Sequence, residues 1–358
     1  AGLLEDEPRF DYSGGATCPS LLLEPSRTNL VTNSEYFEGF WLTTRIIPTP
    51  NAATSPDGLQ NAYKIQQSAT DTNGGAFYVS SIGSTGDMTY SLFIKSGTCP
   101  FVRILENSAG TTRQTWFNVD AGSVGTKNAG HIAEIKPYGN DWYRCSISFT
   151  STQSTFGVLN YLSEADNTTT ASINTNIYAY GAQLEAGSYP TSYIPNHSGG
   201  TITRGEDFGE TSDISAGIGN TEGVLYAEFK YFDSGVNQSI TLNGGSSSNR
   251  FGFYVNGSNE LYALSANTTL DLNADTGTTL VHGTTYKLAI RYDGGNIDFF
   301  LNGGSTPIYS TTGINVSTAL DRVSTSNAIT STFMSSTNQI LVFPTALSDS
   351  ECIALTTI

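Results

Sequence analysis

The sequence has little charge, and positive charge is its scarcest part. Only 13% of its 358 residues are charged, and 16 Lys and Arg stand against 32 Asp and Glu, giving a formal net charge of −16. Since few cations are present to neutralise phosphates, the composition disfavours nucleic-acid binding. No apolar run reaches about 18 residues, the length a helix needs to cross a bilayer. The sequence therefore predicts no membrane insertion.

Cysteine is also scarce and widely spaced. Cys18, Cys99, Cys145 and Cys352 form no C-x-x-C pair and have no histidine close by, which argues against a zinc site. Cys99 and Cys145 could form a disulfide if their strands pair, but a sequence does not supply the geometry such a bond needs. We favour four small buried side chains, and the pairing of Cys99 with Cys145 stays open.

Aromatic residues and turn formers are abundant instead, with 19 Tyr, 18 Phe, 3 Trp and 37 Gly. Many short segments alternate polar and apolar residues with a period of two, which is typical of strands that are buried on one face. These segments are 90–95, 101–105, 116–119, 142–149, 156–162, 177–180, 223–229, 239–242, 250–255, 260–264, 286–292, 297–301 and 339–343. Turn residues over 256–259 and 293–296 indicate hairpins.

This pattern predicts an all-β fold made of two tandem antiparallel β-sandwich (jelly-roll) domains with a short C-terminal helix. The helix is expected after Ser348, an N-cap residue with Glu351 three positions on. The length fits two domains, and a Pro-, Ser- and Gly-containing stretch at 195–200 suggests the boundary. We expect an exposed lead-in segment over residues 1–17 and domains over residues 18–199 and 200–358.

Several motifs follow one another in a recognisable order. In the first half they are LLLEPSRTNL at 21–30, FW at 40–41, WYR at 142–144, GAQLE at 181–185 and TSYIP at 191–195. This series resembles a module found repeatedly in bacteriophage tail-fibre and head-spike proteins, similar in plan to jelly-roll carbohydrate-binding modules. Residues 223–229, 286–303 and 340–351 resemble the concanavalin A-like (laminin-G-like) sandwich. The resemblance implies ligand binding, usually to sugars, and often without catalysis.

Sugar binding needs an aromatic face for the ring and planar polar groups for the hydroxyls. Period-two alternation should turn Val102, Ile104, Phe117 and Val119 inward and leave other residues on the opposite face. Asn160 or Tyr161 could join that opposite face, and Phe300 is an odd apolar residue on the outside of the second domain, explained equally by a ligand or a subunit contact. The candidate ligand-binding residues are Arg103, Trp116, Asn118, Arg144, Tyr254 and Arg291. A local basic groove would form if Arg103 and Arg144 came together.

Catalytic signatures are absent from the sequence. It has neither the Glu-x-Asp-x-x-Glu pattern of paired glycosidase carboxylates nor a G-x-S-x-G nucleophile turn. We therefore assign no catalytic residue and no metal ligand, and we expect no required cofactor. A structural Ca²⁺ ion held by the turn acids Asp57, Asp120, Asp233 or Asp293 stays open, although turn capping is the favoured role of each.

The sequence therefore predicts a non-catalytic glycan-recognition or adhesion module. The resemblance implies a place at the virion surface or outside the cell, a cell-surface polysaccharide and other fibre proteins as partners, and a homotrimer in which weak sites gain from multivalency. Two alternatives remain: a polysaccharide depolymerase or lyase, and a structural virion decoration protein without a ligand. A Trp116→Ala change that left host adsorption unaltered would favour the last.

Overall fold

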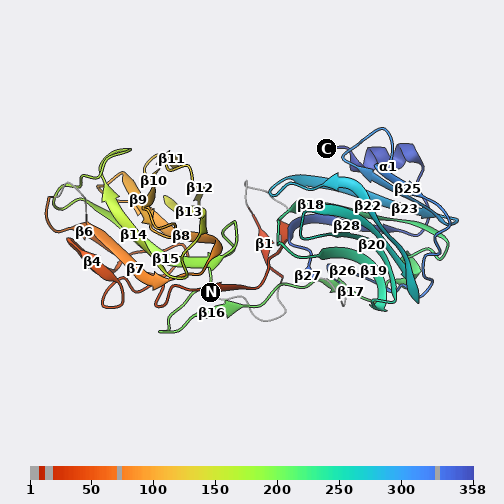
Figure 1. The fold of residues 1–358 in the computed structure, drawn as a ribbon, viewed down its shortest axis with the longest axis horizontal. Helices are drawn as coiled ribbons and strands as arrows, with labels where there is room; N and C mark the ends of the chain where they lie inside the picture. Colours follow the sequence, from red (N-terminus) through yellow and green to blue (C-terminus); the bar gives the residue numbers. More distant parts are fainter. Residues whose placement is uncertain (1–7, 13–18, 71–74, 327–330) are drawn as a thin grey trace. The chain divides into compact units, whose positions relative to one another are not determined.

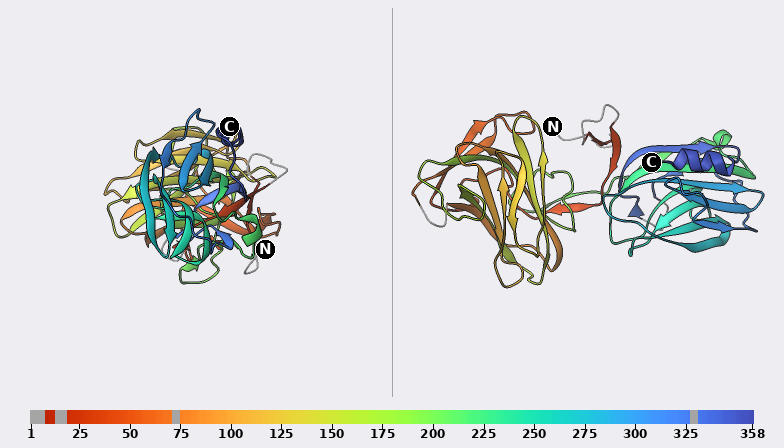
Figure 2. Two further views of the ribbon diagram at one scale, coloured as in Figure 1. Left: turned by 90° about the vertical axis from the view of Figure 1, so that its right-hand side faces the viewer. Right: turned by 90° about the horizontal axis from the view of Figure 1, so that it is seen from above.

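The computed structural model describes residues 8–12, 19–70, 75–326 and 331–358. The described part is all-β, apart from one C-terminal helix and a 3-10 turn at Ser215–Gly217, and it divides into two compact units (Figure 1). Each unit consists of two stacked sheets, which Figure 2 shows from two further directions. No helix in this part of the chain has the length and apolar character to cross a membrane. The expected fold class is confirmed.

The first unit, Ser26–Arg204, is a sandwich of two six-stranded antiparallel sheets. The sheet here called the β9 sheet has the order β11 (Ser123–Lys127), β10 (Arg113–Asn118), β9 (Phe101–Glu106), β14 (Phe156–Ser163), β7 (Ala76–Ile82) and β4 (Leu42–Thr44). The facing β8 sheet has the order β12 (Ile132–Pro137), β13 (Trp142–Ser151), β8 (Gly86–Ser96), β15 (Asn176–Ala186), β6 (Ala62–Gln67) and β5 (Ile46–Ala53). A separate two-stranded ladder pairs β3 (Arg27–Asn29) with β16 (Ile202–Arg204).

Alternation along the strands builds the core between these two sheets. Val102, Ile104 and Phe117 point inward from the β9 sheet and belong to one buried cluster with Leu92 and Ile147 of the β8 sheet. Burial of large apolar side chains contributes about 1.5–3 kcal/mol each relative to exposure. The inward positions predicted from the sequence are confirmed, so the alternate residues of β9 and β10 face away from the core.

The second unit is a sandwich of two larger sheets. The β18 sheet has the order β1 (Phe10–Asp11), β2 (Ser20–Leu23), β28 (Ser335–Phe343), β18 (Glu222–Tyr231), β23 (Thr285–Asp293), β24 (Asn296–Leu301) and β25 (Tyr309–Thr311). The β20 sheet has the order β17 (Glu210–Thr211), β26 (Arg322–Ser324), β19 (Gln238–Ser246), β20 (Asn249–Val255), β21 (Glu260–Asn267) and β22 (Thr269–Thr279), and β27 (Ser331–Thr332) pairs with β19 in parallel.

The C-terminal helix α1 (Asp349–Thr356) lies against β23 and β24, on the outer face of the β18 sheet. It begins with the expected capping box, in which Ser348 and Glu351 bond reciprocally. The helix covers Phe300, which is fully buried in a cluster with Val224 and Cys352. Phe300 is therefore explained by the helix of its own chain, and neither a ligand nor a second subunit is needed to cover it.

The division of the chain differs from the expected one at its beginning. β2 pairs with β28, and β1 pairs with β2, so residues 8–12 and 19–25 group with the second unit and not with the first. Arg9 reinforces this arrangement through ion pairs with Glu24 and Asp207. β2 supplies hydrogen-bond partners to the backbone groups at the edge of β28, which would otherwise be unpaired. Of the predicted lead-in, residues 1–7 and 13–17 lie outside the described part, and Phe10–Asp11 is a strand.

Local turn signals are confirmed where the chain is described. Asp293 pairs directly with Asn296 at the end of the β23–β24 hairpin, and residues 256–259 connect β20 to β21. The thiols of Cys99, Cys145 and Cys352 are buried and free, so Cys99 and Cys145 are not bridged, and Cys18 lies outside the described residues. Burial raises the pKa of Cys99 to about 11, as expected for an inert, buried thiol.

Candidate functional site

The outer face of the β9 sheet carries a row of directly paired side chains. Tyr78 on β7 pairs with Leu159 on β14, Leu159 with Leu105 on β9, and Leu105 with Gln114 on β10. Leu42 of β4 extends the row on the other side of Tyr78. Directly paired side chains on one face lie about 4.5–5.5 Å apart at Cβ. Leu42, Tyr78, Leu159 and Leu105 thus form a largely apolar strip across the sheet. The strip ends at the side-chain amide of Gln114.

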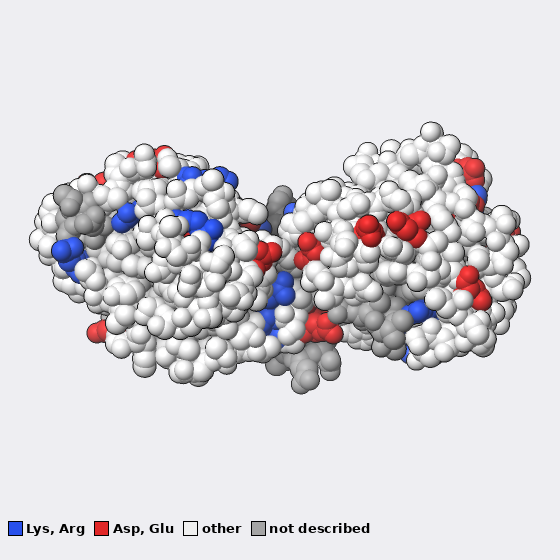
Figure 3. Space-filling view, in the orientation of Figure 1, with Lys and Arg blue, Asp and Glu red and all other residues white. Residues whose placement is uncertain are grey.

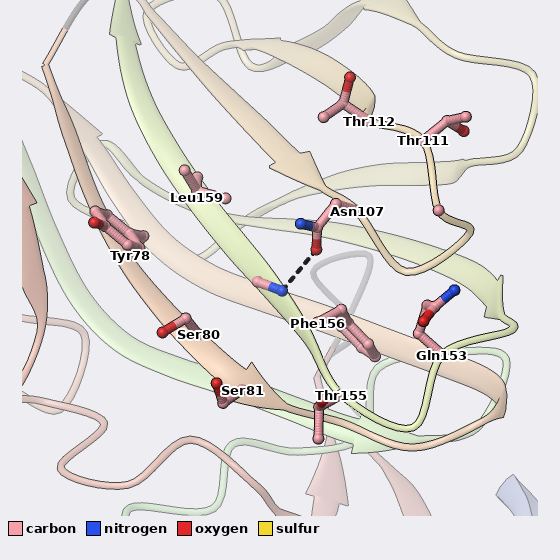
Figure 4. A pocket seen from close by; sticks show the side chains of 12 residues that line it. Tyr78, Ser80, Ser81, Asn107, Thr111, Thr112, Gln153, Thr155, Phe156 and Leu159 are labelled. Atoms are coloured by element: carbon pink, nitrogen blue, oxygen red, sulfur yellow. Dashed lines mark hydrogen bonds between the residues drawn. The ribbon is translucent and has the colours of Figure 1, made fainter.

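A groove of about 650 Å³ opens beside this strip (Figure 4). Its walls come from β7, from the β9–β10 turn, and from the connection between β13 and β14. The lining residues are Tyr78, Ser80, Ser81, Asn107, Gly110, Thr111, Thr112, Gln153, Thr155, Phe156, Gly157 and Leu159. An aromatic ring, an aliphatic side chain and several amides and hydroxyls thus face one concave space, which is the usual make-up of a small-ligand site.

A β-bulge shapes one wall of the groove. Ile82 pairs with Phe156 and Val79 with Val158, so two residues of β7, Ser80 and Ser81, stand opposite the single Gly157. Ser81 adopts the left-handed region with φ of 59°, which is uncommon for a residue other than glycine. Bulges redirect side chains and are frequent beside binding sites. Here the bulge turns both serines toward the groove rim.

The opposite wall, the β9–β10 turn, is held by a buried ion cluster. Glu106 accepts hydrogen bonds from the backbone N–H of Ser108 (2.6 Å) and from Arg113, and His131 Nε2 lies 3.1 Å from its carboxylate. Burial alone would raise the pKa of Glu106, but these hydrogen bonds outweigh burial and lower it to about 2. At the next position, Asn107 Oδ1 accepts a hydrogen bond from Gly157 N (2.8 Å; Figure 4). The cluster thus fixes the turn against β14.

Arg103 and Trp116 lie together on the outer face of the β9 sheet, as predicted. With Tyr161 they form a second row of paired side chains, next to the apolar strip. The Arg103 guanidinium lies 4.1 Å from the ring centroid of Tyr161 and 5.8 Å from that of Trp116, and it donates to Gln114 Oε1 (3.2 Å). However, Trp116 is only 3% exposed, and its Nε1 donates to the carbonyl of Thr168 (2.6 Å). The segment that follows β14 therefore covers the indole, which presents no open face for a sugar ring.

Asn118 and Arg144 have structural contacts. Asn118 Oδ1 accepts hydrogen bonds from the backbone of Asp120 and Ala121, so it caps the turn after β10. Arg144 is 7% exposed and belongs to the β8 sheet, on the opposite side of the sandwich from Arg103. Its guanidinium donates to the carbonyl of Thr191 (2.7 Å) and to Ser91 Oγ (2.8 Å). Arg103 and Arg144 therefore form no common basic groove.

The motif residues of the first unit fix the chain segments that cover the β8 sheet. Gln183 and Glu185 of β15 bind each other, and Glu185 also accepts hydrogen bonds from the hydroxyl and backbone N–H of Thr191. Asn29 Nδ2 donates to the carbonyls of Ala182 and Ile194. The polar side chains of Asn29, Gln183, Glu185 and Thr191 thus form hydrogen bonds within the protein. The recurring motifs thus encode a buried hydrogen-bond network and not the groove.

Two carboxylates of this region meet at one tyrosine. The Tyr180 hydroxyl lies 3.0 Å from Glu35 Oε1 and 2.9 Å from Asp57 Oδ2, and the Tyr193 hydroxyl lies 3.1 Å from Glu35 Oε1. Burial and the neighbouring carboxylates raise the pKa of Tyr180. Asp57 is exposed whereas Glu35 is buried, and Asp57 also caps its own turn through Ser55. This is the place in the described chain where two acids approach one phenol.

In the second unit, Tyr254 lies on the outer face of the β20 sheet, as predicted. Its ring stacks on Tyr262 at 4.8 Å and 21°, and its hydroxyl lies 2.8 Å from Asn273 Oδ1. Both rings are half-buried. The pair forms a small aromatic surface on this sheet.

Arg291 has a structural position on the other sheet of this unit. Its guanidinium pairs with Asp298 (2.7 Å) and Asp349 (2.6 Å) and donates to the carbonyl of Leu347 (2.9 Å). Burial by itself would lower the pKa of Arg291, but the hydrogen bonds that its guanidinium donates to these carboxylates outweigh burial and raise the pKa. The side chain therefore fastens the start of α1 to β23 and β24.

The turn acids act as caps where their contacts are described. Asp57 Oδ1 accepts a hydrogen bond from Leu59 N, and Asp233 Oδ1 accepts one from Gly235 N. Within residues 8–12, 19–70, 75–326 and 331–358, no group of three or more His, Cys, Asp or Glu side chains is placed to share a metal ion. The Ca²⁺ expectation stays a prediction.

Comparison with known proteins gives similarity to solved structures alone. No protein-family model matches the chain, and no curated protein matches it. The CBM40 module of the Ruminococcus gnavus IT-sialidase, solved with alpha2,3 sialyllactose, is 20% identical, with 41% of this chain and 91% of that chain covered and a TM-score of 0.35. A putative carbohydrate-binding protein from Bacteroides ovatus is 12% identical (76% and 81% covered, TM-score 0.33). Domains LG4-5 of the mouse laminin alpha1 chain are 9% identical (97% and 96% covered, TM-score 0.27). These TM-scores are low, and a fold alone does not determine function.

Three residues that line the groove, Tyr78, Asn107 and Gln153, were not among the ligand-binding candidates predicted from the sequence. Tyr78 lies in a segment whose alternation continues into a bulge, and Asn107 and Gln153 lie in turns. Alternation gives the face of a strand residue but not the shape of the turns around it. The signal that was available is the clustering of Ser, Thr, Asn and Gly at 107–112 and 151–155, which marks two loops of neutral polar character.

Proposed function

We propose that the chain is a non-catalytic glycan-recognition module that binds sugar in the groove on the outer face of the β9 sheet. The carrying observation is the groove itself, where the half-buried ring of Tyr78 and the side chain of Leu159 adjoin amides and hydroxyls. Sugar rings stack on aromatic and aliphatic surfaces, while amides and hydroxyls bind the ring hydroxyls in fixed directions. The lining contains no carboxylate or histidine that could protonate a glycosidic oxygen, which supports binding without cleavage.

A Tyr78→Ala variant tests this assignment. We expect it to weaken glycan binding about tenfold or more, because it removes the aromatic contact surface of the groove. Tyr138→Ala is the matched control, since Tyr138 is an exposed tyrosine at the start of the turn after β12, in the other sheet. Binding of the intact chain to a panel of bacterial surface polysaccharides and oligosaccharides, measured by calorimetry, is the readout. Equal loss in both variants, or no loss in either, would refute the assignment.

Glycan cleavage is the second candidate function, favoured by the approach of Glu35 and Asp57 to Tyr180. Paired carboxylates are the usual groups of glycosidases, and a tyrosine can act as the base of a lyase. Incubation with the polysaccharide that binds, followed by assays for new reducing ends and unsaturated uronates, separates the two functions. Product formation that disappears in Glu35→Gln and Asp57→Asn would establish the enzyme.

We further propose that the chain acts at a virion surface, as part of a tail fibre or head spike that contacts a host polysaccharide and other fibre proteins. The support is the series of motifs at residues 21–30, 142–144, 181–185 and 191–195. The same resemblance supports a homotrimer, in which three weak sites act together. A solution mass three times that of the chain, and inhibition of phage adsorption by the purified chain, are the expected results. Unaltered adsorption at saturating protein would favour the structural alternative.

A further inference from the structure

The lining of the groove is electrically neutral throughout. It consists of one Tyr, one Phe and one Leu, together with Ser, Thr, Asn, Gln and Gly residues. A carboxylate or sulfate that enters such a site loses part of its hydration and meets no opposite charge that would compensate for the loss. A hydroxyl loses much less hydration free energy than an ion does. A hydrogen bond to an amide or hydroxyl of the groove compensates for this loss.

The charged residues of the neighbouring strands are already engaged within the protein. Glu106 and Arg113 pair with each other behind the β9–β10 turn, and the Glu106 side chain is fully buried. Arg103 is 5% exposed, with its guanidinium placed between the rings of Tyr161 and Trp116. None of these three side chains lines the groove. An anionic ligand there would therefore find no accessible cation from these strands.

The net charge of the whole chain also disfavours the binding of anionic ligands. At a net charge of −16, the protein repels polyanions at long range and slows their approach. On the face drawn in Figure 3, the Lys and Arg side chains are scattered and form no continuous basic surface. The neutral lining of the groove and the negative electrostatic field of the protein thus both disfavour the binding of acidic polysaccharides.

We propose, building on the function proposed above, that the groove selects neutral glycans: hexose or N-acetylhexosamine oligomers without carboxylate, sulfate or phosphate. Tyr78 and Leu159 supply the surface for one sugar ring. Asn107, whose Oδ1 is fixed by Gly157 N, keeps its amide nitrogen as a donor for a hydroxyl, and Gln153 lies on the exposed rim with both a donor and an acceptor. The acidic form of the same oligomer is excluded by the absence of a partner charge in this lining.

Matched ligand pairs test the selection. Calorimetry on the intact chain compares lactose-based oligosaccharides with and without a terminal sialic acid, and glucan or chitin oligomers with uronate oligomers of the same length. We expect the neutral member of each binding pair to bind at least about tenfold more tightly. Its affinity should also stay constant between about 20 mM and about 500 mM salt, because no ion pair contributes. Tyr78→Ala should weaken this binding about tenfold or more, and Tyr138→Ala should not weaken it.

A Gln153→Arg variant supplies the converse test. A guanidinium on the exposed rim should improve binding of the acidic member relative to the neutral one, and this improvement should disappear at high salt. If acidic members bind the native chain as tightly as neutral ones, and Tyr78→Ala removes both, the selection is refuted while the glycan site stands. If no saccharide binds, or binding ignores Tyr78→Ala, the glycan site itself is refuted.

Discussion

Glu106 holds the β9–β10 turn that forms one wall of the groove, although Glu106 itself does not line the groove. Its carboxylate joins Ser108 and Arg113 of the β9–β10 turn to His131, beyond β11 in the chain. Because the folded state lowers its pKa from 4.5 to about 2, ionised Glu106 stabilises the fold above about pH 4.5, and this contribution is lost as the pH falls toward 2.

Glu106→Gln is therefore expected to lower the free energy of unfolding by about 3 kcal/mol at neutral pH. Glu134→Gln, in which an exposed acid of β12 is changed, should have little effect. Urea unfolding at about pH 7 and about pH 2.5 is the measurement, and the difference between native chain and Glu106→Gln should shrink at the lower pH. A difference that persists unchanged would contradict the electrostatic account.

Residue orientation could be predicted from the sequence, whereas residue exposure could not. Alternation put Arg103 and Trp116 on the same outer face, where the structure has them. It did not reveal that the segment around Thr168 closes over the indole, because that segment has no periodic pattern. For the same reason Arg144 looked available, although Thr191 and Ser91 bind its guanidinium.

At the level of elements, Arg291 links helix α1 to the β18 sheet beside the apolar cluster of Phe300. The guanidinium contacts an acid on β24 and an acid in the first turn of the helix, and it lies over the Phe300 ring. The helix dipole also favours the acids in that first turn. Removing the cation would leave Asp298 partly buried without its partner, which is the costly kind of ion-pair loss.

Arg291→Ala should therefore destabilise the second unit by about 2 kcal/mol or more and increase amide exchange in Asp349–Thr356. Arg322→Ala is the matched control, because Arg322 also contacts two acids but at a more exposed position, so a smaller shift is expected. Hydrogen exchange by mass spectrometry and thermal melting give the two readouts. Unchanged exchange in the helix would show that the apolar cluster alone holds it.

Strands with one apolar face were predictable, and edge strands were much less so. β9, β13 and β20 have clear alternation and were expected, as was the capping box of α1. β11 and β12 were not expected, because they are short and mostly exposed. β5 contains Pro48 and Pro50, which weaken a strand pattern, and it occupies the edge of its sheet, where proline is tolerated.

At the scale of the whole molecule, the second unit is made from two separate parts of the sequence. Local patterns give no information on pairing between β2 and β28, which the expected domain limits therefore missed. The residues that hold the N-terminal segment in place are Arg9, Glu24 and Asp207, brought together from distant positions. The two-sandwich architecture was predictable, and the route of the chain through it was not.

Deletion of residues 1–25 is expected to destabilise the second unit, because β28 loses its neighbour and its hydrogen-bonding edge becomes open to other chains. The first unit should melt as before. Differential scanning calorimetry of the deletion variant, the intact chain and the separate fragment Ser26–Arg204 provides the comparison. Identical melting of the second unit with and without residues 1–25 would show that β1 and β2 contribute no stability.

Because the second unit is built from two separate parts of the sequence, it cannot be completed until the second part has been synthesised. Ser20 and Asn338, which contact each other in the finished sheet, are 318 residues apart, and a ribosome needs about 15–60 s to make that length. During this interval β2 can pair with β1 but not with β28, while the whole of Ser26–Arg204 becomes available to fold. The first unit therefore has time to fold completely before β28 is made and β2 can take its place beside it.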